Sequence, residues 1–367
     1  MHPVPILRHG PPDESDICYY ALDRAVREGW SGMANGFPEI GVGTMMWVPE
    51  DDAQRQELFE TYQYCLDHGV DFFDTAEVYG NGSVERLLGE FIREDGRPVR
   101  ISSKFAPPSS MNPVAPKRKN VPTDSPEALA EALDGTLSRL GLESLDLYLM
   151  HTPPKSGSIA DYMDVMAREV ERGRVRAVGV CNFGRAQIEE AARALEARGL
   201  TLSAAMVGYN LLRRYPETNG VIDACRAHGV TLIPYAPLAE GVLTGKYRKS
   251  GKVPLKYWIT SYFGHLDLTH ERDDGVPLIK RIFSKPRECD VERMEPLMEM
   301  LEGIAEERGK SIAQVSLNWL ATNPEVDVFP IPGMKSVRQA ESDIDAVGWS
   351  LTAEERDRID RAERACR

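Results

Sequence analysis

The sequence predicts a closed (β/α)8 barrel that starts near residue 39 and extends towards the C-terminus. Short apolar runs alternate along the chain with segments of helical spacing, which is the pattern of a parallel sheet covered by helices. Eight such units in about 300 residues favour a closed barrel over an open sheet. Polar and reactive side chains follow the ends of the expected strands, where barrel enzymes place their active sites.

We expect strands where apolar residues form runs that are too short for helices. The expected strands are residues 40–44, 70–74, 99–104, 144–150, 175–180, 204–207, 230–235 and 326–331. The segments between them have helical spacing, as in Leu58, Tyr62, Cys65 and Leu66. The expected helices are residues 51–67, 84–91, 126–140, 159–172, 185–198, 217–228, 293–308 and 311–322, with another that begins at Val337.

The chain divides into an extension and one domain. Residues 1–38 are rich in proline, glycine and charge, and we expect an N-terminal extension with a short helix at residues 17–27. We expect residues 39–367 to form a single barrel domain. Two irregular stretches, 106–125 and about 246–290, are long for a compact barrel, and such loops usually carry function or are disordered. Aromatic residues in the second stretch favour a binding lid, although packing against the barrel explains them equally well.

The composition argues against several classes of partner. A net charge of −13 over 367 residues disfavours nucleic acids and anionic membranes. No apolar run approaches the ~18 residues of a membrane span, and the start lacks the apolar core of a secretory signal. The six cysteines are scattered without a CxxC pair, so we expect reduced thiols, a cytoplasmic protein and no metal site. The oligomeric state stays open.

Four residues that suit acid–base chemistry follow successive strands. Asp74 ends one strand and Tyr79 lies just beyond it, Lys104 ends the next strand, and His151 follows the one after. A phenol has a reference pKa of ~10, and neighbouring cations make it a usable proton donor by favouring its ionised form. A buried lysine needs an anionic partner, which Asp74 would supply. Taken alone, each residue has an ordinary structural explanation. Their joint occurrence at one end of the barrel favours catalysis.

The chain resembles the aldo-keto reductase superfamily over about residues 38 to 362. The matching segments are IGVGTMMW at 40–47, DFFDTAEVYGNGSVERLLGE at 71–90, ISSKF at 101–105, DLYLMHTPP at 146–154, VRAVGVCNF at 175–183, LIPYAPLAEGVLTGKY at 232–247 and FPIPGMKSVRQ at 329–339. The catalytic tetrad of that family is intact here as Asp74, Tyr79, Lys104 and His151. The resemblance implies an NADPH-dependent reductase that converts an aldehyde or ketone of a small or medium-sized organic substrate to an alcohol. Tyr79 would be its proton donor.

The resemblance also implies that NADPH lies across the rim formed by the strand ends. The substrate would contact Trp47, Tyr79 and His151, and no metal is implied. The implied cofactor-binding residues are Gly43, Thr44, Met45, Asp74, Cys181, Asn182, Met206, Tyr235, Ala236, Pro237, Leu238, Glu240, Gly241, Gly333, Lys335, Ser336, Gln339 and Asp343.

This chain departs from the family pattern at the two ends of the expected cofactor. Cys181 and Met206 stand where the family commonly has serine and glutamine to hold the nicotinamide carboxamide. Asn182 alone keeps strong hydrogen-bonding capacity there, because thiols and thioethers are weak partners. At the adenine end, Ser342 and Asp343 replace the usual acid and asparagine.

The start of the last barrel helix favours NADPH over NADH. Lys335, Ser336 and Arg338 can bind a phosphate through charge-assisted hydrogen bonds, and a helix N-terminus adds a favourable field. No acid lies between residues 332 and 340, whereas an NADH site often has one for the ribose hydroxyls. Ser336 has the alternative role of capping this helix.

Two other functions stay open on the sequence alone. Some barrels of the family are non-catalytic, cofactor-binding subunits of larger assemblies, and turnover of NADPH with carbonyl compounds would distinguish them. A Schiff-base enzyme such as an aldolase would use Lys104 as its nucleophile instead. Borohydride trapping of a substrate on Lys104 would identify that enzyme.

Overall fold

The computed structural model describes residues 37–107, 123, 125–155, 157–254 and 290–366. The chain divides into two compact units, Met1–Pro38 and Glu39–Arg367, and all the elements below belong to the second unit. The predicted helix at residues 17–27 and most of the predicted loop at 246–290 lie outside the described residues. The predicted domain organisation therefore stays a prediction.

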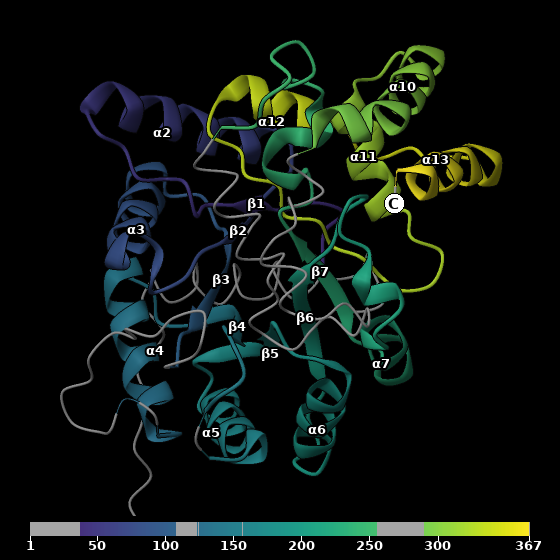
Figure 1. The fold of residues 1–367 in the computed structure, drawn as a ribbon. Helices are drawn as coiled ribbons and strands as arrows, with labels where there is room; N and C mark the ends of the chain where they lie inside the picture. The colour runs from purple at the N-terminus through teal and green to yellow at the C-terminus, as the bar shows by residue number, and fades with distance from the viewer. Residues whose placement is uncertain (1–36, 108–122, 124, 156, 255–289, 367) are drawn as a thin grey trace, which may run out of the picture. The chain divides into compact units, whose positions relative to one another are not determined.

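Parallel strands form the centre of the barrel, and they pair in the order in which they occur in the chain. Helices lie around the outside of these strands (Figure 1). The strands are β1 (Val42–Gly43), β2 (Phe72–Asp74), β3 (Arg100–Phe105), β4 (Leu145–Met150), β5 (Val175–Cys181), β6 (Leu202–Gly208) and β7 (Thr231–Tyr235).

The segment 327–333 closes the barrel between β7 and β1. It pairs with Leu232 of β7 on one side and with Gly43 of β1 on the other, in parallel bridges and hydrogen bonds. The sequence predicts a regular strand here, but Pro330 and Pro332 have no N–H to donate and interrupt the ladder. The eighth position is filled by bridges, and the predicted (β/α)8 barrel is confirmed.

The helices match the expected ones within a few residues, apart from α7 and α13. A short 3-10 turn at Tyr215–Glu217 precedes α7, so the helix starts later than expected. Helix α13 was not predicted, although Thr352 and Glu355 form a capping box at its start. The helices are α2 (Asp52–Asp67), α3 (Ser83–Asp95), α4 (Glu127–Leu140), α5 (Ile159–Glu171), α6 (Arg185–Glu196), α7 (Val221–His228), α10 (Val291–Arg308), α11 (Ile312–Ala321), α12 (Val337–Ile344) and α13 (Ala353–Ala365).

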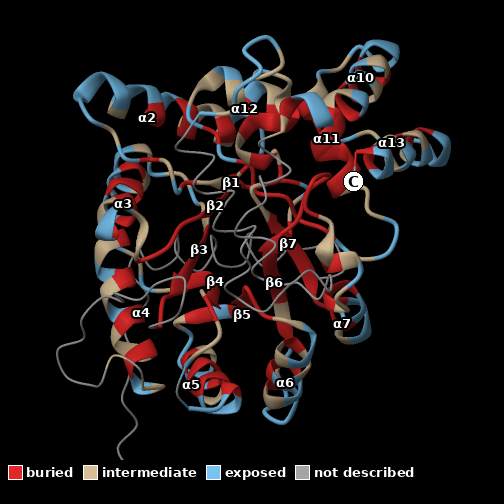
Figure 2. Ribbon diagram, in the orientation of Figure 1, coloured by how far each residue is buried: buried red, intermediate tan, exposed pale blue. Residues whose placement is uncertain are grey.

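The buried residues lie on the strands and on the helix faces that turn towards them (Figure 2). An aromatic cluster packs around the end of β2. The ring of Phe73 lies 4.9 Å from Tyr62 and 5.9 Å from Trp47, and both of these rings also pack on Phe91. This packing fixes the strand immediately before Asp74, the first of the predicted catalytic residues. Among the described residues, no helix has the length and apolar composition needed to cross a membrane.

Candidate active site

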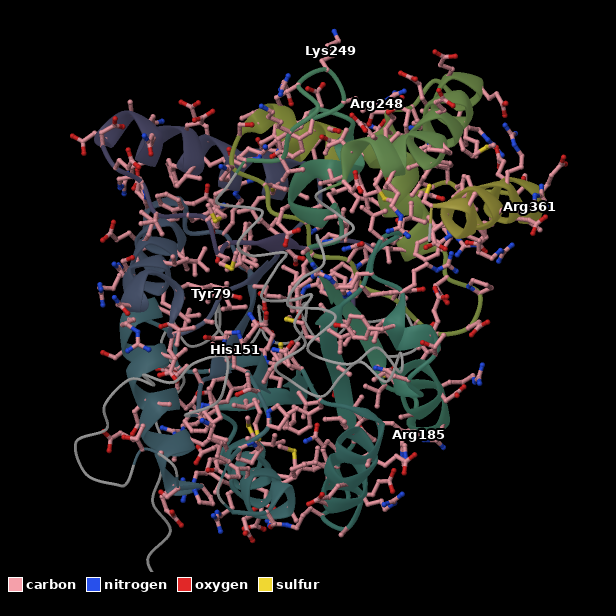
Figure 3. The ribbon with its side chains drawn as sticks, in the orientation of Figure 1. Tyr79, His151, Arg185, Arg248, Lys249 and Arg361 are labelled. Carbon is pink, nitrogen blue, oxygen red and sulfur yellow. The ribbon has the colours of Figure 1, made fainter. Side chains whose placement is uncertain are left out.

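The four predicted catalytic residues meet at the carboxyl ends of β2, β3 and β4. Asp74 is the last residue of β2, Lys104 is the penultimate residue of β3, and His151 directly follows β4. Tyr79 begins a short 3-10 turn after β2. The rings of Tyr79 and His151 lie 6.0 Å apart at an interplanar angle of 81°, and Figure 3 shows them close together.

Lys104 lies between the carboxylate and the phenol. Its Nζ donates to Asp74 Oδ2 at 2.6 Å and to the Thr75 carbonyl oxygen at 2.8 Å, and it lies 3.3 Å from the Tyr79 hydroxyl. The lysine side chain is fully buried, and that of Asp74 is 4% exposed. A charge removed from water this completely requires a partner of opposite charge. The pair therefore holds a permanent cation beside the phenol.

Burial and charge act on the phenol in opposite directions. Burial raises the pKa of Tyr79 to about 12, and the Lys104 ammonium opposes only part of that rise. The sequence analysis predicts that the pKa of Tyr79 is lowered. That prediction takes too little account of the free energy needed to place a phenolate in a buried site. Burial by itself lowers the pKa of Lys104, but Asp74 and Tyr79 raise it above its ordinary value overall. At neutral pH the phenol therefore keeps its proton and the lysine keeps its charge.

His151 presents a neutral imidazole to the phenol. Burial and the charge of Lys104 lower the pKa of His151 to about 3. Its backbone is held on both sides, because its N–H donates to the Phe105 carbonyl at 2.8 Å and its carbonyl accepts from Asn182 Nδ2 at 2.9 Å. Its buried Nδ1 has no hydrogen-bond partner among the described residues. The ring is thus available to a polar atom of a ligand.

The predicted nicotinamide residues are brought together at the ends of β5, β6 and β7. Cys181 pairs with Met206 in the sheet register, and the Asn182 N–H donates to the Met206 carbonyl at 2.9 Å. The Asn182 amide makes three contacts: Nδ2 donates to His151 and, at 3.3 Å, to Cys181 Sγ, while Oδ1 accepts from the Tyr235 hydroxyl at 3.0 Å. Asn182 adopts a left-handed backbone, with φ at 61°. Its side chain is therefore oriented by neighbouring strands.

The loop after β7 brings a cation that the sequence interpretation missed. Three residues of this loop, Ala236, Ala239 and Glu240, have positive φ between 47° and 51°, and Gly241 has φ at 90°. A Cβ atom at Gly241 would collide with Lys246 Nζ, so this lysine lies directly over the glycine. The sequence signal was available, because Lys246 belongs to the matching segment at 232–247.

Lys246 also lies close to a second cation. Burial and the neighbouring charge of Lys335 lower the pKa of Lys246. Lys335 lies two residues before Val337, the first residue of α12. A bound anion would offset the repulsion between two neighbouring ammonium groups. This arrangement fits the phosphates of a dinucleotide.

The backbone at the end of β1 lies close to the backbone at the end of the closing segment. Gly43 pairs with Gly333, and a Cβ atom at Gly43 would lie 3.0 Å from a backbone carbonyl oxygen. Thr44 donates through both its N–H and its hydroxyl to the Asp74 carbonyl, at 3.0 and 2.8 Å. Ser336 caps α12 by accepting from the Gln339 N–H at 3.4 Å. Capping and phosphate contact use the same end of the helix and are compatible.

Trp47 and Asp343, two of the residues predicted to bind a ligand, are buried in the structure. Trp47 is 1% exposed, and its Nε1 donates to the Met334 carbonyl at 2.7 Å. That position does not fit a substrate contact. Met45 and Val48 of the same loop are the exposed apolar residues, at 54% and 50%. Asp343 faces inwards from α12 at 5% exposure, and burial raises its pKa to about 7.

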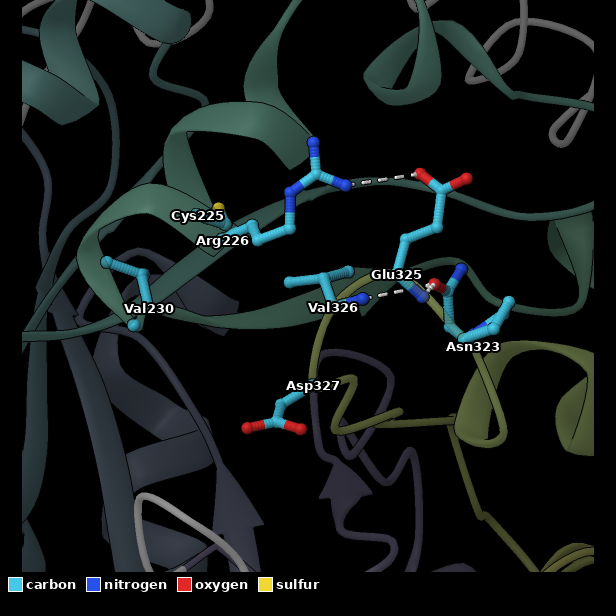
Figure 4. A pocket seen from close by; sticks show the side chains of 9 residues that line it. Cys225, Arg226, Val230, Asn323, Glu325, Val326 and Asp327 are labelled. Atoms are coloured by element: carbon cyan, nitrogen blue, oxygen red, sulfur yellow. Dashed lines mark hydrogen bonds and ion pairs between the residues drawn. The ribbon is translucent and has the colours of Figure 1, made fainter.

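A hollow of about 250 Å³ lies at the start of β7, away from all these residues. Figure 4 shows its lining, in which Arg226 faces Glu325 at 4.0 Å and the Asn323 side chain accepts from backbone N–H groups of its own loop. Arg226 also pairs with Asp223 at 2.6 Å. None of the predicted catalytic residues lines this hollow.

Comparison with known proteins agrees with this geometry. The model of the aldo/keto reductase family matches residues 39–364. The chloroplastic pyridoxal reductase of Arabidopsis thaliana is 32% identical over 334 residues, covering 86% of this chain and 80% of that protein. The aldo-keto reductase yakc of Schizosaccharomyces pombe, named with NADP(+), is 27% identical over 321 residues, with coverages of 86% and 85%. A glycerol dehydrogenase structure from Gluconobacter oxydans matches with a TM-score of 0.70 at 25% identity, covering 90% of this chain and 93% of that one.

Proposed function

This chain belongs to the aldo/keto reductase family and is an NAD(P)H-dependent oxidoreductase, and on that premise we propose that it uses NADPH to reduce the carbonyl of an aldehyde or ketone to an alcohol. The observation that carries the proposal is the position of Lys104 Nζ between Asp74 and the Tyr79 hydroxyl. A buried proton donor beside a fixed cation suits a reaction that builds negative charge on an oxygen atom. The substrate would be a small or medium-sized organic molecule.

Bound NADPH would supply the hydride that adds to the carbonyl carbon. Tyr79 would donate its hydroxyl proton to the carbonyl oxygen, and Lys104, 3.3 Å from that hydroxyl, would stabilise the phenolate that remains. Asp74 would hold the lysine in place through its 2.6 Å contact. His151, neutral because of its lowered pKa, would donate a hydrogen bond that orients the carbonyl.

We assign the cofactor to the rim between β1, β5 and β7 and the start of α12. Tyr235 would stack on the nicotinamide, with Asn182 beside it, while Gly43 lets the backbones of β1 and of the closing segment lie close together. Lys246 and Lys335, which are close enough for the charge of Lys335 to lower the pKa of Lys246, would both bind phosphate. The named cofactor of the Schizosaccharomyces pombe relative supports NADP over NAD.

The geometry argues against a Schiff-base enzyme. A lysine nucleophile must lose its proton, and desolvation without an anionic partner is the usual way to lower its pKa. Lys104 instead contacts Asp74 at 2.6 Å, and its pKa is raised.

Turnover of NADPH distinguishes a reductase from the alternative function, a cofactor-binding regulatory subunit. We expect NADPH absorbance to fall when the protein is mixed with a panel of aldehydes and ketones. Tight NADPH binding without oxidation of NADPH by any compound would instead identify the subunit.

Cofactor choice should depend on the cations at the start of α12. Replacing Lys335 and Arg338 together with methionine is expected to reduce the preference for NADPH over NADH by about 10-fold or more. Each charge-assisted hydrogen bond to phosphate is worth ~1.5–3 kcal/mol, and ~1.4 kcal/mol is a tenfold change. The measurement is kcat/KM for each cofactor at a fixed carbonyl concentration.

A matched control removes one lysine and one arginine elsewhere. Lys249 and Arg361 extend outwards in Figure 3, and Arg361 pairs only with the exposed Asp357 of its own helix among the interactions described for it. Lys249→Met with Arg361→Met changes net charge equally and should leave the cofactor preference unchanged. An equal loss of preference in both double variants would show a general charge effect and would remove the phosphate site from α12.

Carbonyl reduction should be insensitive to the ordinary titration of histidine. Because the pKa of His151 is lowered to about 3, its imidazole is protonated only below that pH and stays neutral from about pH 5 to pH 8. We therefore expect kcat at saturating NADPH to show no histidine-like transition in this range. NADPH is kept saturating so that kcat reports groups in the complex and not the binding of the cofactor. A transition near the ordinary value of about 6.5 that disappears in His151→Gln would contradict the neutral imidazole.

A further inference from the structure

We infer that Ser102 is a positioning residue for the proton-donor site and acts by holding the Asp74 carboxylate. The inference rests on the proposed function. Ser102 Oγ donates to Asp74 Oδ1 at 2.6 Å, while Lys104 Nζ donates to Oδ2 at the same distance. Ser102 is fully buried. Each oxygen of the carboxylate therefore has its own donor, and the plane of the carboxylate is fixed by two contacts.

The sheet register creates this arrangement. Asp74 of β2 and Ser102 of β3 are direct partners in the parallel ladder, so their side chains share one face. Lys104 lies two residues further along β3 and points to the same side. The Ser102 carbonyl also accepts from the Thr75 N–H at 2.9 Å. A single strand thus supplies both the cation and the hydroxyl that orients its counter-ion.

The hydroxyl should affect the chemistry through charge as well as position. Asp74 raises the pKa of Tyr79, in opposition to Lys104. A hydrogen bond from Ser102 stabilises the negative charge of Asp74, so the carboxylate competes less strongly for the lysine. Without it, only Lys104 would hold the Asp74 carboxylate, and Lys104 would stabilise the Tyr79 phenolate less well.

The next residue along the strand provides a matched control. Ser103 is also fully buried and also donates to a buried carboxylate, Glu85 Oε1, at 2.7 Å. Its side chain points to the opposite face of the strand, where Glu85 pairs with Arg139. Ser103→Ala removes the same hydroxyl from the same strand without touching the proposed catalytic residues.

The experiment compares Ser102→Ala with Ser103→Ala in the full-length chain. Both variants lose one buried hydrogen bond and should lower the Tm by a similar few degrees. Only Ser102→Ala should lower kcat for carbonyl reduction, by about 10-fold, with the KM for NADPH unchanged. In the direction of alcohol oxidation, which needs the Tyr79 phenolate, the rise of rate with pH should move to higher pH in that variant alone.

A double-mutant cycle tests whether Ser102 acts through Asp74. In the Asp74→Asn background, Ser102→Ala should cost less than about 2-fold in kcat, because the charge that it stabilises is already absent. Equal loss of kcat in the two serine variants, an unshifted pH profile, or additive effects in the cycle would each overturn the inference. Wild-type protein that reduces no carbonyl would overturn the proposed function, and this inference with it. Wild-type turnover with unchanged Ser102→Ala kinetics would overturn the inference alone.

Discussion

Replacing Tyr79 with phenylalanine is expected to lower carbonyl reduction by at least about 100-fold and to leave NADPH binding intact. The change keeps the ring, which packs at right angles to His151, and removes only the hydroxyl beside Lys104. Among the described residues at this position, His151 is neutral and Lys104 is held by Asp74, so we expect neither to replace Tyr79 as the proton donor. The measurement is single-turnover reduction with NADPH bound beforehand.

Tyr62 provides the control for this substitution. Its hydroxyl is buried and has no hydrogen-bond partner among the described residues. Its ring packs on Phe73, next to the active site but outside it. Tyr62→Phe should therefore keep full activity. Near wild-type reduction by Tyr79→Phe would remove Tyr79 from the role of proton donor.

Lys104→Met should abolish most of the reduction, by at least about 100-fold, and higher substrate concentrations should not restore it. The ammonium stabilises the phenolate that forms in the transition state, so its loss lowers kcat rather than substrate affinity. Asp74→Asn should be milder, because the cation next to Tyr79 remains. Steady-state kinetics of both variants measure this order, and a far larger loss in Asp74→Asn would contradict it.

We expect Lys104→Met to lower the stability of the protein as well as its activity, so the two effects must be measured separately. Removing one partner of a buried ion pair typically costs ~3–5 kcal/mol, since the other charge stays buried without compensation. Lys104→Met leaves Asp74 in that state, with its side chain 4% exposed. The double variant Asp74→Asn with Lys104→Met neutralises the pair and should regain much of the Tm. Its activity should stay as low as that of Lys104→Met. Recovery of activity together with stability would show that the lysine is structural.

The sequence predicts the barrel and the meeting of the four reactive residues for one physical reason. Strands in a parallel barrel all deliver their carboxyl ends to one rim, so residues such as Asp74 and Lys104 converge without any knowledge of their contacts. The match to the aldo/keto reductase family confirms the predicted family and enzyme class. The assignment of individual residues, and the cytoplasmic location expected from the cysteines, stay predictions.

Other features depend on tertiary packing and could not be predicted from the sequence. The apolar pattern around Trp47 does not say whether the ring turns towards the rim or into the core, and its contacts with Phe73 and Met334 settle this. The pKa of Tyr79 depends on the balance between burial and the charge of Lys104, and this balance follows from the three-dimensional structure. The position of Lys246 over Gly241 is likewise visible only in three dimensions, although the residue belongs to the matching segment at 232–247.

The central claim is that Tyr79 and Lys104 form the proton-donor site of a carbonyl reductase. NADPH deuterated at the nicotinamide carbon that carries the hydride tests it most directly, with the alcohol product analysed by mass spectrometry after a single turnover. We expect one deuterium on the former carbonyl carbon with wild-type protein and with Tyr62→Phe. We expect almost none with Tyr79→Phe, although that variant binds the cofactor. Absence of deuterium transfer by wild-type protein to every aldehyde and ketone tested, or equal transfer by Tyr79→Phe, would contradict it.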